Sequence, residues 1–161
     1  MGLDMYLYKK SFVKNFSFDN PEKQYKVEVS RGGVLRTDIK PHRITQVVEE
    51  VGYWRKFNAL HSWFVNNCGG GIDECQAIDV SEDDLRNLRE VLVKVVENDF
   101  KTAEDDLPPA QGFFFGSDVV DDYYKECVIE TINTIQDILN ENEDIKDAGF
   151  YGSDFYYRAS W

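Results

Sequence analysis

The fold is decided around residues 52–64, whose sequence is GYWRKFNALHSWF. At about 100° per residue on a helix, four apolar residues of this stretch form one stripe, the pattern of a helix that faces a core. The stripe consists of Tyr53, Phe57, Leu60 and Phe64. Three glycines follow at positions 69–71 and supply a left-handed helix end. The stretch therefore predicts a core-facing helix that runs to about Asn67.

The same stretch also predicts a ligand site. Trp54, Asn58 and His61 follow helical spacing on a stripe beside the apolar one. An indole can stack on a planar ring, while an amide and an imidazole can bind its polar edges. Arg55 and Lys56 lie close by in the sequence and would bind phosphate, although Arg55 points away from this stripe on an ideal helix. The alternative interpretation is that Trp54 and His61 are half-buried packing residues, which is common for both types.

Charge divides the 161-residue chain into two unlike parts. The net charge is −12, yet residues 1–60 carry 11 Lys and Arg against 7 Asp and Glu. Residues 61–161 carry 7 against 23, so the balance is +4 before Leu60 and −16 after it. Such an acidic chain is poorly suited to direct DNA binding or to anionic membranes, whose affinity comes from neutralised phosphates. It favours contact with a basic protein surface.

The cysteines and the hydropathy pattern point to the cytoplasm. Three cysteines without CxxC spacing, Cys68, Cys75 and Cys127, are typical of reduced thiols. The first residues, MGLDMYLYKK, place Asp4 inside a short apolar run and lack the pattern of a signal peptide. No run approaches the roughly 20 apolar residues of a membrane helix.

Strand patterns lie near both ends of the chain. Residues 3–9 alternate in polarity, as a half-buried strand does, and residues 24–29 and 34–37 read as a hairpin around Gly32-Gly33. Residues 43–51 suit a strand or a helical turn, and we favour the strand because Gly52 would separate it from the helix. Residues 74–80 and 155–161 read as further strands.

Two further helices are expected in the second half. Ser81 caps one of them, with carboxylates in its first turn and a buried stripe that includes Leu85, Leu88 and Leu92. Ser117 or Asp118 would cap the last helix, which we expect to end near Leu139 before a charged surface loop over residues 140–147. The run Phe113–Phe115 reads as a buried strand or turn. Together the elements predict one α+β domain over residues 1–161, a mostly antiparallel sheet with about three helices packed on one face.

The usual catalytic patterns are missing from this sequence. Two histidines and the Cys68-x6-Cys75 spacing do not form a zinc site, so neither a metal nor another cofactor is expected. His61 and Cys68 would lie two helical turns apart, about 10 Å, which is too far for a thiolate and imidazole pair unless the glycines bring Cys68 back. Neither glycine-serine turn has the Gly-x-Ser-x-Gly form of a hydrolase. We therefore expect a binding protein rather than an enzyme.

Three separated motifs carry a family resemblance. The segments are GLDMYL at residues 2–7, EVGYWRK at 50–56 with Asn58, His61, Trp63 and Phe64, and GFFFGS at 112–117. Together they resemble an uncharacterised family of small proteins encoded by phages and some bacteria. The resemblance implies an accessory protein that acts in the cytoplasm of a bacterial host cell.

Two functions follow as hypotheses, because small accessory phage proteins commonly antagonise host defence. In the first, the protein binds and sequesters a nucleotide-derived signal through Trp54, Asn58 and His61, with Arg55 or Lys56 on a phosphate. In the second, the acidic part of the chain blocks a basic surface of a host defence protein, as an inhibitor or nucleic-acid mimic. The exposed aromatic residues would also permit a homo-oligomer.

Overall fold

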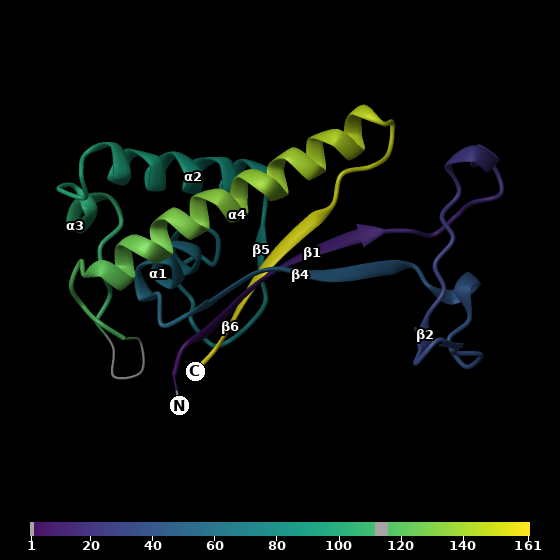
Figure 1. The fold of residues 1–161 in the computed structure, drawn as a ribbon, viewed down its shortest axis with the longest axis horizontal. Helices are drawn as coiled ribbons and strands as arrows, with labels where there is room; N and C mark the ends of the chain where they lie inside the picture. Colours follow the sequence, from purple (N-terminus) through teal and green to yellow (C-terminus); the bar gives the residue numbers. More distant parts are fainter. Residues whose placement is uncertain (1, 112–115) are drawn as a thin grey trace.

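The computed structural model describes residues 2–111 and 116–161, which form an α+β fold. Four antiparallel strands make the main sheet in the order β4-β1-β6-β5. Their bounds are β1 Asp4–Phe12, β4 Gln46–Arg55, β5 Ile78–Val80 and β6 Asp154–Ser160. The helices are α1 Asn58–Asn67, α2 Glu82–Glu97, the one-turn α3 Ala103–Asp106, and α4 Asp122–Asp147. Figure 1 shows the three long helices gathered beside the sheet, as predicted.

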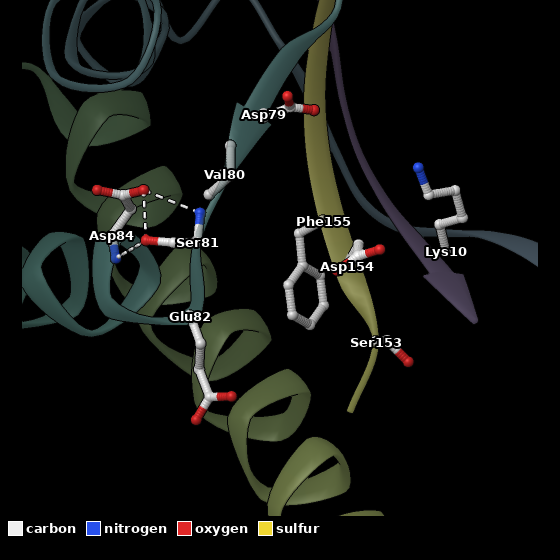
Figure 2. A pocket seen from close by; sticks show the side chains of 9 residues that line it. All are labelled: Lys10, Asp79, Val80, Ser81, Glu82, Asp84, Ser153, Asp154 and Phe155. Carbon is white, nitrogen blue, oxygen red and sulfur yellow. Dashed lines mark hydrogen bonds between the residues drawn. The ribbon is translucent and has the colours of Figure 1, made fainter. Parts of the chain in front are cut away.

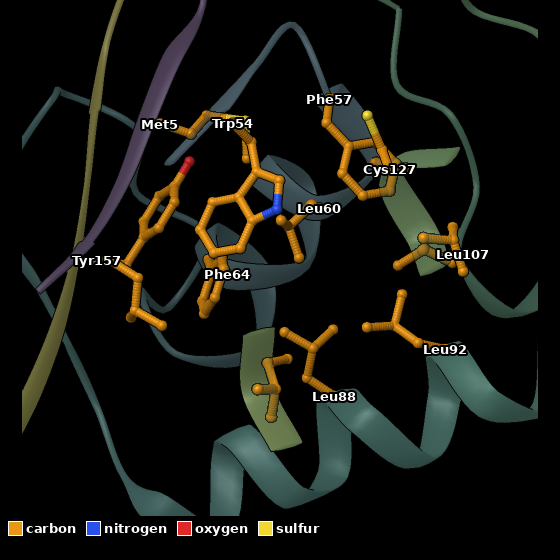
Figure 3. Packing of buried hydrophobic residues seen from close by; sticks show 14 of the residues in the cluster. Met5, Trp54, Phe57, Leu60, Phe64, Leu88, Leu92, Leu107, Cys127 and Tyr157 are labelled. Carbon is orange, nitrogen blue, oxygen red and sulfur yellow. The ribbon is translucent and has the colours of Figure 1, made fainter. Parts of the chain in front are cut away.

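Alternation along the strands separates a buried sheet face from an open one. In β1, Met5 and Leu7 are fully buried, whereas their even-numbered neighbours Asp4, Tyr6 and Tyr8 are not. In β6, Phe155, Tyr157 and Ala159 are buried in the same way. These side chains join the helices in a single hydrophobic cluster, part of which Figure 3 draws. The helices therefore cover one face, and the even-numbered residues of β1 and β6 lie on the other.

The predicted start of the first helix is wrong. Residues 53–55 continue β4, where Tyr53 pairs with Tyr6 and Arg55 pairs with Asp4. Gly52 lies inside the strand instead of ending it. The sequence there also alternates, and pairing along β1 decides in favour of the strand. The chain then turns at Lys56, whose φ is +56°, and α1 begins at Asn58.

Three of the four residues predicted to form the core-facing stripe are buried. Leu60 and Phe64 are fully buried, and Phe57, just before the helix, is 2% exposed. Tyr53 instead lies on the open side of β4 and is 47% exposed. The helix ends at Asn67 as predicted, before Gly70 and Gly71, which both have positive φ.

The cap predicted for α2 is confirmed. The Ser81 hydroxyl accepts a hydrogen bond from the Asp84 backbone N–H at 3.0 Å, and the Asp84 carboxylate accepts one from the Ser81 N–H at 2.8 Å. This reciprocal capping box satisfies donors that would otherwise be unpaired at the helix start. The predicted buried stripe is present at Leu85, Leu88 and Leu92.

Both predicted ends of the last helix are wrong. Asp121, rather than Ser117 or Asp118, caps α4 by accepting from the Tyr124 N–H at 2.9 Å. The helix also continues through residues 140–147, which were expected to form a loop. Asn142 explains the extension, because it is 4% exposed and its carbonyl oxygen accepts from the Ser153 N–H at 2.8 Å.

Residues 13–45 form an arm that projects beyond the sheet (Figure 1). The arm contains a two-residue hairpin, β2 Ser30–Arg31 and β3 Val34–Leu35, and two 3-10 turns, Pro21–Lys23 and Pro41–Arg43. The predicted turn at Gly32-Gly33 is present with positive φ, but residues 24–29 form no strand. Within the described part of the chain, no helix has the length and apolar character needed to cross a membrane.

The predicted strand or turn over Phe113–Phe115 lies outside the described residues. The remaining strand predictions are right in place and differ in length. β5 spans Ile78–Val80 where residues 74–80 were expected, and β6 spans Asp154–Ser160 where residues 155–161 were expected.

Candidate functional site

Trp54 lies in the hydrophobic core. Its side chain points to the helix-covered face of β4 and is 4% exposed. Figure 3 shows the indole among Met5, Leu60 and Phe64. Gly52 makes room for it, because a Cβ atom at that position would lie 2.4 Å from the indole ring. Trp54 therefore presents no open ring face for a ligand in this structure.

Asn58 is buried and holds two segments together. Its side-chain nitrogen donates to the Ser117 carbonyl at 2.7 Å, and its side-chain oxygen accepts from the Ala110 N–H at 3.0 Å. These bonds fix the two ends of the segment that carries the GFFFGS motif against the start of α1. Both polar atoms of the amide therefore bind protein groups.

His61 connects α1 to β6 and to the glycine-rich loop. It is 3% exposed, with Nδ1 at 2.7 Å from the Tyr157 hydroxyl and Nε2 at 3.1 Å from Asp73 Oδ2. A carboxylate only accepts hydrogen bonds, so we assign the proton of the neutral ring to Nε2. Nδ1 then accepts from the Tyr157 O–H. Both ring nitrogens thus bind protein groups.

The hypothetical pairing of His61 with Cys68 gains no support from these contacts. Both His61 nitrogens have the partners named above, and neither partner is the thiol. Burial raises the pKa of Cys68 to about 12, which disfavours the thiolate that a nucleophile needs.

Arg55 and Lys56 lie outside the core, so the structure separates the five predicted site residues into two groups. The Arg55 side chain is 61% exposed, and its Nε lies 3.8 Å from Asp4 Oδ1, a long ion pair. The Tyr123 hydroxyl donates to the Arg55 carbonyl and ties the end of β4 to α4. Lys56 is also exposed. Both cations stand at the end of the sheet where β1 begins.

The open sheet face carries a continuous row of four tyrosines, which we call the tyrosine face: Tyr53, Tyr6, Tyr8 and Tyr156. The ring centroids are 5.3 Å apart for Tyr53 and Tyr6, 6.0 Å for Tyr6 and Tyr8, and 4.9 Å for Tyr8 and Tyr156. The last two pairs are stacked, with interplanar angles of 17° and 24°. The row crosses three adjacent strands, so it exists only after the sheet has formed.

Cations flank one end of the tyrosine face. Arg158 pairs with Tyr6 across β1 and β6, and Arg55 pairs with Asp4 in the neighbouring row. The Tyr53 hydroxyl donates to Asp4 Oδ1 at 2.7 Å, and this hydrogen bond raises the pKa of Tyr53. Burial raises the pKa of Tyr8 at the middle of the row. Both phenols therefore keep their protons at neutral pH.

Sequence reasoning missed the tyrosine face, although part of the signal was present. Alternation in β1 places Tyr6 and Tyr8 on one side, but it does not say which strands lie beside them. The register shifts between Leu7 and Tyr8, so Tyr6 lies opposite Tyr53 while Tyr8 lies opposite Glu50. The rings meet because β1 pairs with β4 at Tyr6 and with β6 at Tyr8, and this pairing is not readable from the sequence.

A polar hollow of about 620 Å³ lies where β5 and β6 meet the start of α2 (Figure 2). Two of the carboxylates that line it, Glu82 and Asp84, hold the surrounding structure together. Asp84 belongs to the capping box drawn in Figure 2, and Glu82 accepts hydrogen bonds from Asn142 on α4 and from Lys146. The Lys146 bond is the main reason why the pKa of Glu82 falls to about 2. The contacts of Glu82 thus join α2 to α4 at the edge of the hollow. We assign no ligand to the hollow.

Two further observations bear on the site. Within residues 2–111 and 116–161, no group of three or more His, Cys, Asp or Glu side chains is arranged to hold a metal ion. Comparisons with protein family models, with curated proteins and with solved structures gave no match.

Proposed function

We propose that the protein is a non-enzymatic binding protein that takes up a nucleotide-derived ligand on its tyrosine face. The observation that carries the proposal is the Tyr53–Tyr6 pair, which has Arg55 on one side and Arg158 on the other. We thus retain a nucleotide as the ligand, but we propose that its base stacks on the exposed Tyr53 instead of the buried Trp54.

Stacking supplies the first part of the affinity. A base on an aromatic side chain contributes about 1–3 kcal/mol, whatever the base, because every base has a π face. Tyr53 is the most accessible ring of the row. The row extends over three strands, about 10 Å across the sheet. That width suits a ligand with two separated ring groups, such as the two bases of a dinucleotide or the adenine and the distal ribose of an ADP-ribose-type molecule.

The flanking cations supply the second part. Guanidinium groups bind phosphate through paired N–H donors. Among the residues that the structure describes, the Arg55 guanidinium has only the long contact with Asp4 to give up, so its donors can turn to a ligand at small cost. Lys56 adds a third positive charge near the start of β1, where its side chain lies against Gly2. A phosphate at this end would place an attached base over Tyr53 or Tyr6.

The net charge of −12 limits the size of the ligand. A long nucleic acid would bring many phosphates toward the acidic helices and be repelled. A ligand with one or two phosphates meets mainly the local cations. Together with the resemblance to phage proteins, this favours sequestration of a small nucleotide signal of host defence.

The test is isothermal titration of the purified chain with a panel of cyclic dinucleotides and ADP-ribose-type nucleotides. We expect one or more to bind, and Tyr53→Ala to weaken that binding by at least about tenfold, the loss of one stacked base. Arg158→Gln should weaken binding of the phosphorylated ligand but not of its nucleoside. Tyr151→Ala removes an exposed tyrosine outside the face and serves as the matched control.

Chromatography of the ligand after incubation distinguishes binding from turnover. We expect the ligand to be recovered unchanged. Absence of binding across the panel, or binding that Tyr53→Ala and Arg158→Gln leave intact, would reject the tyrosine face as a nucleotide site. Conversion of the ligand would reject the non-enzymatic assignment.

A second candidate function is favoured by the outer surface of α4. Eight exposed carboxylates follow this helix: Asp122, Glu126, Glu130, Asp137, Glu141, Glu143, Asp144 and Asp147. Such a surface suits a basic patch on a host defence protein. Capture from host lysate should then recover a partner that rising salt releases, because salt screens exposed charges. A partner retained at high salt would count against this function.

A further inference from the structure

A cluster of exposed aromatic side chains lies where the arm leaves the sheet. Phe12, Phe16 and Phe18 are 43%, 40% and 82% exposed, and Tyr151 from the loop after α4 is 85% exposed. We call these four residues, with Tyr25 and Phe150, the aromatic patch. Exposed aromatic side chains that lie next to one another mark an interaction surface, whereas single exposed ones are common.

The rings of the patch support one another in an ordered arrangement. Phe16 stacks on Phe18 with centroids 5.3 Å apart and an interplanar angle of 6°, and Phe12 stacks on Phe16 at 6.2 Å. Tyr25 contacts Phe150 across the gap between arm and loop at 5.7 Å. The patch therefore joins two segments that are far apart in the sequence.

A cavity of about 200 Å³ lies within the patch, between the arm and the loop after α4. Phe12, Phe16, Tyr25, Phe150 and Tyr151 contribute rings to its lining. This volume is below the roughly 300 Å³ at which sites for drug-sized ligands begin, and it suits one inserted side chain. Phe18 and Tyr151, the two most exposed aromatic residues of the patch, stand next to this cavity or on its wall.

The charged residues around the aromatic patch include equal numbers of cations and carboxylates, Lys14 and Lys23 against Asp19 and Glu22. Lys14 and Lys23 place their ammonium groups 5.5 and 6.0 Å from the Phe16 and Phe150 ring centroids. Within the described parts of the chain, neither lysine has a carboxylate within ion-pair distance. Asp19 and Glu22 lie in the same short segment of the arm. Two cations beside two carboxylates make a surface that can face its own copy without a local excess of like charge.

We propose that the partner of the aromatic patch is a second copy of this chain, packed patch to patch about a twofold axis. An exposed ring of each copy enters the aromatic cavity of the other, and the lysines of one copy meet the carboxylates of the other. The observation that selects a second copy is that projecting rings, an unfilled ring-sized cavity and balanced charges occur on one surface. A twofold interface requires such self-complementarity.

This dimer is independent of the proposed nucleotide site. Phe12 and Tyr6 are six residues apart on β1, which corresponds to about 20 Å along the strand. The cations around Tyr53 lie at the opposite end of β1 from the arm. Dimerisation through the patch thus leaves the ligand end of the tyrosine face open.

Sedimentation velocity of the full chain, from about 1 to about 200 µM, tests the dimer. We expect a concentration-dependent equilibrium between monomer and dimer. Phe18→Asp and Tyr151→Asp, each of which places a charge on a projecting ring position, should raise the dimer Kd by at least about tenfold. Ile72→Asp changes an apolar residue that is 56% exposed outside the patch, and it should leave the Kd unchanged.

Thermal unfolding of each variant checks that the fold is intact. We expect Phe18→Asp and Tyr151→Asp to fold normally, because both side chains are highly exposed. A chain that stays monomeric over the whole concentration range would overturn the proposal. A dimer that neither substitution weakens would also overturn it. A series of growing oligomers would do the same, because open-ended assembly indicates contact between two unlike surfaces.

Discussion

Replacing Tyr157 by Phe tests whether the buried His61 network holds the C-terminal strand to α1. The substitution removes one hydroxyl group that lies 2.7 Å from His61 Nδ1. The ring itself stays in place, because it is 1% exposed and stacks on Phe64 with centroids 4.3 Å apart. The loss is therefore one hydrogen bond with almost no change in packing.

The expected cost comes from the group left behind. His61 is buried, so its Nδ1 acceptor would have neither the hydroxyl nor ready access to water. An unsatisfied buried polar group costs about 1–3 kcal/mol, more than the net value of an average hydrogen bond. We expect Tyr157→Phe to lower the free energy of unfolding by that amount.

Urea unfolding followed by tryptophan fluorescence measures this change. The midpoint should fall while the slope with denaturant stays constant, because the same surface is exposed on unfolding. Tyr156→Phe is the matched control, since this neighbouring hydroxyl lies on the open sheet face and should change stability by less than about 0.5 kcal/mol. A Tyr157→Phe effect as small as that of the control would refute the reasoning.

Three further predictions concern stability. Gly52→Ala should cost about 1–3 kcal/mol in urea unfolding and shift the fluorescence of Trp54, because the added Cβ would lie 2.4 Å from its indole. Leu88→Ala should cost about 2–5 kcal/mol in the same assay, since this side chain is on the core-facing side of α2 and is fully buried. Glu82 has a pKa lowered from 4.5 to about 2 by Lys146, so it stabilises the fold above about pH 4.5 and loses this contribution as pH falls toward 2. Unfolding measured across this range should therefore show a smaller acid-induced loss of stability for Glu82→Gln than for the parent protein.

The sequence predicted correctly those features that depend on residues close together in the chain, namely the start of α2 and the end of α1. The α2 cap is a pattern within four residues, Ser81 to Asp84, and it formed as expected. The helix end before the glycines depends in the same way on backbone conformations that only nearby residues decide.

The errors occur where distant contacts decide the structure. Residues 53–55 satisfy both a helical and an alternating pattern, and only the presence of β1 beside them selects the strand. Polar residues 140–147 look like a loop because the buried role of Asn142 depends on Ser153 and Glu82, which come from other elements. A single sequence contains no sign of either contact.

The predicted site shows the same limit. Trp54, Asn58 and His61 were placed together on the assumption of one continuous helix, and the strand turned Trp54 into the core. Whether any of them contributes to binding stays a prediction. Arg55, which an ideal helix would have directed away from this stripe, instead lies near the exposed Tyr53. Lys56 lies at the same end of the sheet. The choice of residues thus depended on an element boundary, the least certain part of a sequence-based assignment.

The strand order has a consequence for how the chain folds during synthesis. β6 lies between β1 and β5, although β1 is the first strand to leave the ribosome and β6 is the last. Until residues 154–160 emerge, β5 has no neighbour and β1 shows one bare edge, which can pair with another nascent chain. We therefore expect the sheet to close only after residues 154–160 have been synthesised, and translational pausing shortly before the codon of Asp154 to prolong the aggregation-prone state.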